Sequence, residues 1–348
     1  MTRYPKLLLS ILTANMFSLN KPIIVCLNVT NRCNMNCSYC YGDYYNRKTC
    51  DFTTDQLLEL IDTLSMMGTR LIHLGGGEPL IRDDISKIIS HIKEKNILCF
   101  MNTNGLLIPD KIDAIKKLDS LTISIDGPED INDINRGKGT FRRIIKSIKL
   151  AQDHGISVNT NTVINRHNIS RIDEVLALLD QLKVSAEFNL PYEQELGNKN
   201  NEVMNISDEQ IKNVLKKIIT YKNKGGLTSF STNTRSYTLN WPFSYKKKIA
   251  YNNDLPKGFK PINCQMGRLM CLIDSDGLVY PCGQLIGQFP ALNMLEVGLK
   301  KAWDNLYQNK RCTTCYSVCF NEFNQLFNLN PKVLYLSALR IIKRITKK

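Results

Sequence analysis

Cysteine is the residue whose spacing in this chain indicates the most specific chemistry. Cys33, Cys37 and Cys40 form a C-x3-C-x2-C pattern within one short segment. Three thiolates at this spacing can bind three irons of a [4Fe-4S] cube and leave the fourth iron open for chemistry. The alternatives are a zinc site that lacks its fourth ligand, or a chance coincidence. Twelve cysteines in 348 residues are too sparse for a disulfide scaffold, and their grouping predicts a reducing, cytoplasmic location.

A second group of cysteines occupies the last third of the chain, and its members are Cys264, Cys271, Cys282, Cys312, Cys315 and Cys319. Two fully ligated cubes need eight thiolates, so this group of six favours one iron–sulfur cluster. We expect Cys264 and Cys282 to be ligands, together with two of the three thiols at 312, 315 and 319. Cys271 is either a further ligand or a strand residue. A zinc ribbon is the structural alternative, because paired thiolates also suit zinc.

The elements that must position the first cysteines alternate between short β-branched segments and amphipathic stretches from residue 22 to residue 225. This alternation is typical of βα units on a parallel sheet. The expected strands are Ile23–Asn28, Leu71–Leu74, Leu98–Asn102, Leu121–Ile125, Ser157–Val163 and Ala186–Leu190. The expected helices lie near 54–67, 83–95, 110–118, 139–154, 169–183 and 207–224. Two helices begin with a capping box, at Thr53 with Gln56 and at Ser207 with Gln210.

The unusual residues follow the expected strands. The first cysteines come after strand one, Gly75–Pro79 after strand two, Thr103–Gly105 after strand three, and Ser124–Pro128 at the end of strand four. In a parallel barrel, such loops converge on one face and build one site. The sequence therefore predicts an α/β protein with a partial (β/α)6 TIM-like barrel.

The periodic pattern stops near residue 226, where a segment rich in Ser, Thr, Asn and Lys precedes the second cysteine group. This change predicts four parts. They are an N-terminal extension over 1–21, the partial barrel over 22–225, a small cysteine-rich domain over 226–330, and a basic amphipathic helix over 331–348. The first residues imitate a signal peptide only weakly, since Ser10 interrupts their apolar run and no A-x-A site follows.

Four further motifs follow the first cysteine pattern in order. CNMNCSYC is succeeded by GGGEP, TNG, SIDGP and NRGKGTF between residues 22 and 190. This series resembles the radical S-adenosylmethionine (radical SAM) enzymes. The resemblance implies that SAM binds the open iron through its methionine amine and carboxylate, and that one electron from the cluster cleaves it. The product would be a 5′-deoxyadenosyl radical that abstracts a hydrogen atom from a substrate.

The resemblance also implies roles for residues near the cluster. Tyr39, just before the third cysteine, would pack on the adenine of SAM. Gly76 and Gly77 suit a segment whose backbone approaches a ligand closely. Glu78 would accept a charge-assisted hydrogen bond from the methionine ammonium. These four residues form one half of the predicted SAM site.

The other half of the predicted SAM site comes from later motifs. Asn104 belongs to TNG, and by similarity Ser124 and Asp126 would hydrogen-bond the ribose or the methionine end of SAM. Arg136 would balance the methionine carboxylate. The structural alternative is an ordinary turn at Asn104-Gly105 and at Asp126-Gly127-Pro128.

Other reactive residues are expected to have simpler roles or no defined one. Cys26 and Cys99 lie inside expected strands and are predicted to be buried small apolar residues. His73 is predicted to be structural. A catalytic acid or base is not identifiable, although the residues after strand six are plausible site-facing groups, namely Tyr192, Glu193 and Glu195.

The carboxy-terminal cysteines resemble the SPASM and twitch extensions of radical SAM enzymes. Cys264, Gly277 and Cys282 form C-x12-G-x4-C, and a tight hairpin at Gly277 would bring the two cysteines together. The following C-x2-C-x3-C lacks the five-residue gap of the full SPASM pattern. The resemblance therefore implies one auxiliary [4Fe-4S] cluster, which would relay an electron if it is closed or bind substrate if one iron is open.

The net charge of +14 is concentrated partly at one end, because residues 331–348 carry six basic residues and no acid. An apolar stripe opposite this basic face predicts either a peripheral membrane contact or packing on the protein. No run of eighteen apolar residues predicts a membrane span. No basic patch with interleaved aromatic residues is present, which argues against a nucleic-acid partner.

The combined prediction is a radical SAM oxidoreductase or maturase that oxidises or cross-links a peptide or protein side chain. The alternative is the same chemistry on a small molecule or a membrane-associated lipid-type intermediate. A flavodoxin- or ferredoxin-type protein would supply electrons. An alternative of another class is a non-catalytic iron–sulfur or zinc protein.

Overall fold

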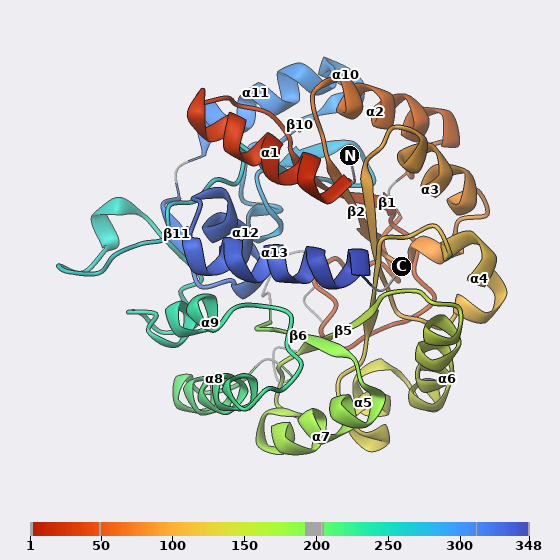
Figure 1. Cartoon of the computed structure of the whole chain (residues 1–348), viewed down its shortest axis with the longest axis vertical. Coiled ribbons are helices and arrows are strands. Elements are labelled where there is room, and N and C mark those ends of the chain that lie inside the picture. The colour runs from red at the N-terminus through yellow and green to blue at the C-terminus, as the bar shows by residue number, and fades with distance from the viewer. Residues whose placement is uncertain (1–2, 49, 192–202, 204, 311, 347–348) are drawn as a thin grey trace.

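Six parallel strands form one side of a nine-stranded sheet, with β6 at its edge (Figure 1). The computed structural model describes residues 3–48, 50–191, 203, 205–310 and 312–346. The six strands are β1 (Ile24–Thr30), β2 (Leu71–Gly76), β3 (Leu98–Thr103), β4 (Ser120–Ser124), β5 (Val158–Val163) and β6 (Ser185–Asn189). Each strand pairs in parallel with the next one along the chain. The predicted α/β class and its six βα strands are therefore confirmed.

Helices connect these strands along the outside of the sheet (Figure 1). The predicted helices are α2 (Thr54–Met66), α3 (Ile85–Glu94), α4 (Ile108–Ile115), α6 (Thr140–Asp153), α7 (Ile172–Leu182) and α8 (Asp208–Asn223). Both capping boxes form as predicted. The sequence pattern did not predict α5 (Glu129–Arg136), because its eight residues include only two apolar side chains. Four 3-10 turns complete the connections: η1 (Pro79–Ile81), η2 (Ile169–Arg171), η3 (Asn252–Asp254) and η4 (Gly283–Leu285).

The two faces of the sheet differ in chemistry. Val25, Leu27 and Val29 of β1 are buried with the apolar faces of the outer helices. Cys26 and Asn28 alternate with them and line an internal cavity. Successive strand residues point to opposite faces, so this alternation separates an apolar outer layer from an inner wall. Cys99 lies in the apolar layer and is fully buried, as predicted.

The predicted carboxy-terminal hairpin is present and extends the same sheet. Strands β8 (Met270–Ile273) and β9 (Leu278–Tyr280) flank a turn in which Gly277 has φ +89°. Strand β9 pairs with β8 and with β10 (Leu292–Asn293) in antiparallel fashion, but β8 pairs in parallel with β1. The sheet is thus continuous across residue 226, and the four-part division of the chain remains a prediction.

The remaining elements lie at the two ends of the chain and around the second cysteine group. Their bounds are α1 (Arg3–Met16), α9 (Thr232–Leu239), β7 (Ile249–Ala250), α10 (Met294–Val297), α11 (Leu299–Asn309), β11 (Thr314–Cys315), α12 (Val318–Phe327) and α13 (Pro331–Thr346). Figure 1 shows α1 and α13 on the viewer's side of the sheet. The carboxy-terminal helix is thus present, and its side chains are described up to residue 339. Among the described residues, no helix is long and apolar enough to cross a membrane.

Candidate functional site

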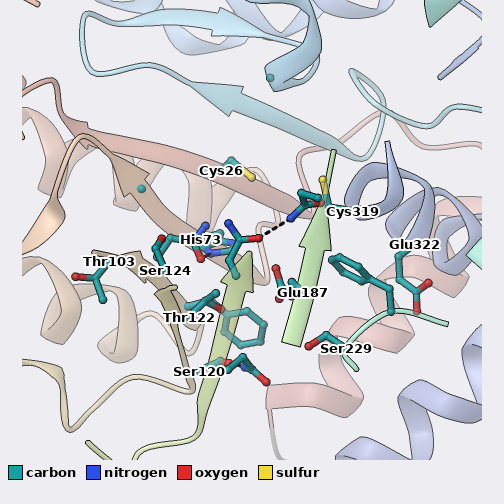
Figure 2. A pocket seen from close by; sticks show the side chains of 18 of the residues that line it. Cys26, His73, Thr103, Ser120, Thr122, Ser124, Glu187, Ser229, Cys319 and Glu322 are labelled. Carbon is teal, nitrogen blue, oxygen red and sulfur yellow. Dashed lines mark hydrogen bonds between the residues drawn. The ribbon is translucent and has the colours of Figure 1, made fainter. Parts of the chain in front are cut away.

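One cavity of about 840 Å³ runs along the inner wall of the parallel strands. Its lining includes all three cysteines of the first pattern and Gly75 to Gly77. Side chains from α1, α12 and α13 close it on another side. Figure 2 shows labelled residues from β1, β2, β3, β4 and β6 and from α12 around this cavity. The loops that follow the first strands therefore meet at one site.

The cysteine loop begins directly after β1 and is tied to its neighbours by hydrogen bonds. The carboxylate of Asp51 accepts hydrogen bonds from the Thr30 hydroxyl at 2.6 Å and from the Asn31 backbone amide at 2.7 Å. On the other side, the amide of Gly77 donates to the Thr30 carbonyl, and the amide of Glu78 donates to the Arg32 carbonyl, both at 2.9 Å. The GGGEP segment thus holds the start of the cysteine loop.

Gly76 and Gly77 are required by this close approach. A Cβ atom on Gly76 would lie 2.3 Å from the Thr30 carbonyl oxygen, and one on Gly77 would lie 2.1 Å from the Arg32 carbonyl oxygen. Gly76 also has φ +113°, which disfavours other residues. The close approach that requires these glycines is the one to the cysteine loop, and the predicted approach to a bound ligand remains a prediction.

Glu78 lies behind the cavity wall, although it was predicted to contact SAM. Its side chain is fully buried and accepts hydrogen bonds from the Thr103 hydroxyl (2.7 Å), the Asn104 amide (2.7 Å) and the Leu80 amide (3.0 Å). Burial raises the pKa of Glu78 to about 7, against the effect of these hydrogen bonds. The Glu78 carboxylate therefore fastens the loop after β2 to the loop after β3.

Three of the predicted SAM-site residues form one buried group. The guanidinium of Arg136 donates to both oxygens of Asp126, at 2.9 and 3.3 Å, and lies 5.6 Å from the ring centroid of Tyr39. The hydroxyl of Tyr39 also donates to Asp126. Tyr39 and Arg136 line the cavity, whereas Asp126 lies behind them. Asp126 therefore orients the two side chains that face the cavity.

Asn104 and Ser124 also line the cavity, as predicted for SAM-site residues. The side-chain amide of Asn104 donates to the side chain of Asn34 in the cysteine loop at 2.7 Å. The turn interpretation of Asn104-Gly105 also holds, because Gly105 has φ +84°. The TNG segment is thus both a turn and part of the site wall.

The donor set of the first cysteine loop fits a cluster with an open iron. The three thiols are partly buried and line one side of a cavity that has space for a further ligand. Burial raises the pKa of Cys33 to about 12 and that of Cys37 to about 11, so these two thiols stay protonated until iron displaces the protons. Within the described residues, no three cysteine, histidine or acidic side chains form a preorganised ion site.

Four of the carboxy-terminal thiols form a second group, which comprises Cys264, Cys282, Cys312 and Cys315. Burial raises the pKa values of Cys282, Cys312 and Cys315, that of Cys312 to about 11, and the neighbouring Cys264 thiol raises them further. The ammonium group of Lys310 donates to the carbonyls of Cys264 and Met266 at 2.9 and 3.0 Å. Proximity to these thiolates raises the pKa of Lys310 in spite of its burial. Four thiols with one neighbouring cation suit a closed cluster.

The other two cysteines of the carboxy-terminal set are Cys319 and Cys271. Cys319 lines the large cavity together with Cys26 (Figure 2). Cys271 is buried in β8, where it pairs with Val25 of β1. Cys271 is therefore a strand residue in the core, and the choice of two ligands among Cys312, Cys315 and Cys319 remains a prediction.

Several cavity residues were not predicted from the sequence. Cys26 was expected in the core but faces the cavity, and it is in register with His73 of β2. The Nε2 atom of His73 lies 2.9 Å from the side-chain oxygen of Asn102, and burial lowers the pKa of His73. Glu187 of β6 lies on the same wall. The period-two alternation of the strands was the signal for this wall. Tyr192, Glu193 and Glu195 lie outside the described residues.

Comparison with known proteins identifies the first part of the chain. Residues 27–179 match the model of the radical SAM superfamily. These residues form a radical SAM domain. The chain is 32% identical to the Fe-coproporphyrin III synthase of Methanosarcina barkeri over 48% of its own length and 43% of that protein. The chain spans less than half of the length of this relative.

Two relatives match a larger share of the chain. The AdoMet-dependent heme synthase of Methanosarcina barkeri is 25% identical and covers 82% of this chain and 83% of its own. The PqqA peptide cyclase of Gluconobacter oxydans is 25% identical over 81% of this chain and 76% of its own length. Streptococcus suis SuiB bound to S-adenosylmethionine shares the fold, with a TM-score of 0.65, 17% identity, and coverages of 84% and 68%. The predicted radical SAM family is confirmed for residues 27–179.

Proposed function

We propose that this enzyme cleaves S-adenosylmethionine reductively and abstracts a hydrogen atom from a peptide or protein side chain. The observation that carries the proposal is the meeting of three thiols, a glycine-walled segment and a large cavity at one end of the parallel strands. The [4Fe-4S] cluster would supply one electron to the bound SAM. The product of that cleavage would be 5′-deoxyadenosine after hydrogen transfer.

In this proposal the chain holds the cofactors through a few of its residues. Cys33, Cys37 and Cys40 bind the cluster that binds SAM. Tyr39 and Arg136 face the same cavity and bind the adenine and the carboxylate of SAM. The burial of the Asp126–Arg136 pair supports this role, because a buried and oriented guanidinium binds a carboxylate without a large ordering cost.

The second thiol group supports an auxiliary [4Fe-4S] cluster held by Cys264, Cys282, Cys312 and Cys315. Four protein ligands leave no iron open, so this cluster would accept or relay the electron that remains on a substrate radical. Loss of a hydrogen atom and an electron, followed by loss of a proton, amounts to oxidation or cross-linking of the substrate. A flavodoxin- or ferredoxin-type protein remains the proposed electron donor.

A peptide substrate is favoured by the inner wall of the cavity. Hydroxyl and amide side chains from β3 to β6 line it, including Ser120, Thr122, Asn159 and Asn161. Such groups can hydrogen-bond to a peptide backbone. The similarity to a peptide cyclase over 81% of this chain supports the same conclusion.

A small-molecule substrate is the second candidate. The wall formed by β8, α12 and α13 is apolar and includes Met270, Phe320, Phe323 and Val333. An apolar wall of this kind suits a flat or branched biosynthetic intermediate, and two relatives are porphyrin-modifying synthases. Peripheral contact of residues 331–348 with a membrane would favour such a substrate.

The test is formation of 5′-deoxyadenosine by anaerobically reconstituted protein given SAM and dithionite. The variant Cys33→Ala/Cys37→Ala/Cys40→Ala is the control. We expect product from the wild type alone, and its absence from a fully loaded wild type that also fails to bind SAM would refute the proposal. Addition of iron coproporphyrin III or of a mixed peptide pool then separates the two substrate classes by which of them stimulates the product.

A further inference from the structure

Helix α1 has two opposite apolar faces. Leu7, Ile11 and Ala14 lie on the inner face and are buried against the apolar cluster that β8 and α12 share. On the opposite face Leu9 is 51% exposed, Leu12 is 44% exposed and Met16 is 73% exposed. These three positions follow the helical spacing of three and four residues and form one stripe. Two residues just beyond the helix continue it, namely Phe17 (66% exposed) and Leu19 (38% exposed).

This exposed stripe lies in a positively charged part of the chain. No acidic residue occurs between residues 1 and 42, and α1 itself carries Arg3 and Lys6. Val333 of α13 packs in the same buried cluster as the inner face of α1, so both terminal helices cover one side of the molecule (Figure 1). Residues 331–348 add six basic residues and no acid. The surroundings of the stripe therefore attract anions.

A second copy of this chain is a poor occupant for the stripe. A stable protein–protein interface needs roughly 20–30 residues from each partner, whereas α1 has 14 residues and presents only one of its faces. Pairing would also bring together two chains with a net charge of +14 each. An anionic bilayer has neither difficulty, because it accepts a short apolar stripe and attracts the flanking cations.

We propose that α1 docks on an anionic membrane surface, with Leu9, Leu12, Met16 and Phe17 inserted below the headgroups. Lys6 then contacts the lipid phosphates, and the basic composition of residues 331–348 adds to the attraction. The proposal does not depend on the cofactor chemistry. In this arrangement helix α1 makes the main apolar contact with the membrane, and residues 331–348 contribute positive charge.

Docking in this way would place one wall of the cavity next to the bilayer. Tyr4, Leu7 and Leu8 of α1 line the cavity, as do Val333 and Ser337 of α13. The same short helix thus separates the cavity from the surface on which it would dock. An apolar substrate held in a bilayer would have a short path to this wall.

The test is flotation of the full-length, cluster-loaded protein with vesicles. One set is phosphatidylcholine alone and the other contains roughly one-quarter phosphatidylglycerol, at about physiological ionic strength. We expect the wild type to float with the anionic vesicles only. The variant Leu12→Glu/Met16→Glu should lower the bound fraction about tenfold, because two charges enter the apolar contact.

The control variant is Met66→Glu, which changes a methionine at the end of α2 that is 80% exposed, similar to the exposure of Met16. It should float like the wild type, and iron content should be equal in all variants. Equal flotation of the α1 variant and the wild type would overturn the proposal, as would equal binding to neutral vesicles or no vesicle binding at all. A wild-type dimer in size-exclusion chromatography that becomes a monomer in the α1 variant would also overturn it and would identify a contact between copies.

Discussion

The two thiol groups of this enzyme differ in how the chain presents them. Cys33, Cys37 and Cys40 come from one short loop and line a large cavity. The second group collects its thiols from the β8–β9 hairpin region and from the segment after α11, and it places Lys310 beside them. A group on one loop can leave a coordination position open, whereas a group drawn from separate segments fastens those segments together. We therefore expect the first to serve chemistry and the second to serve electron transfer and stability.

The largest effect that tests this contrast is the loss of the first thiol group. We expect Cys33→Ala/Cys37→Ala/Cys40→Ala to abolish 5′-deoxyadenosine formation and to lower the iron content from about eight to about four per chain. The protein should remain folded, because this loop is also held by Asp51 and by the GGGEP segment. Anaerobic iron analysis and circular dichroism check both points. If the loss of this first thiol group alone unfolded the protein, the proposed difference between the two thiol groups would be wrong.

The second prediction concerns the ligands of the closed group. Cys315→Ala should lower the iron content by about four per chain and reduce thermal stability, because a four-ligand site loses a closing contact. Cys319→Ala is the matched control, since Cys319 lies four residues further on and faces the cavity instead. It should keep the full iron content. The reverse result, with iron lost only on replacement of Cys319, would assign the fourth ligand differently.

The third prediction separates close backbone approach from a general need for glycine. Gly77→Ala places a Cβ 2.1 Å from the Arg32 carbonyl oxygen, whereas Gly75→Ala meets only the side-chain oxygen of Asn28, at the longer distance of 3.2 Å. We expect Gly77→Ala to weaken SAM binding by about ten- to a hundredfold, because the cysteine loop must shift. Gly75→Ala should change it less than about threefold. The measurement is equilibrium binding of SAM to the cluster-loaded protein with its cluster in the oxidised state.

The smallest effect is a pH dependence of stability from Glu78. Its pKa in the folded protein is about 7, above the value of 4.5 for an ordinary carboxyl group, so the folded state binds more protons than the unfolded state between these values. Stability should therefore fall as the pH rises from about 5 to about 8, by at most about 3 kcal/mol from this group. Glu78→Gln removes the titration. The stability of the wild type relative to the variant should fall with pH in denaturant titrations, and a constant difference would contradict the shift.

The strand order and the convergence of the loops could be predicted from the sequence. Hydrophobic periodicity located all six parallel strands, and parallel packing then required the residues after them to meet. The contacts among Tyr39, Asp126 and Arg136 could not be predicted in detail, because they join two loops and the end of α5 through tertiary packing. For the same reason, the sequence motif alone could not reveal that the Glu78 carboxylate is occupied by backbone amides.

Two further features escaped prediction for different physical reasons. The polar wall with Cys26 and His73 was visible in the alternation of each strand, but buried small residues in strands usually belong to the core. The parallel pairing of β8 with β1 has no local signal, because its partners lie about 240 residues apart. In the second thiol group, spacing alone left the choice among Cys312, Cys315 and Cys319 open.

That same pairing has a consequence for the synthesis of the protein on the ribosome. The backbone groups along the β8 side of β1 remain unsatisfied until residues 270–273 have emerged. At a synthesis rate of about 5–20 residues per second, this edge waits on the order of tens of seconds for its partner. An unpaired strand edge is a template for aggregation during that time. The nascent chain should therefore depend on a chaperone that binds early, before the last third of the enzyme has been translated.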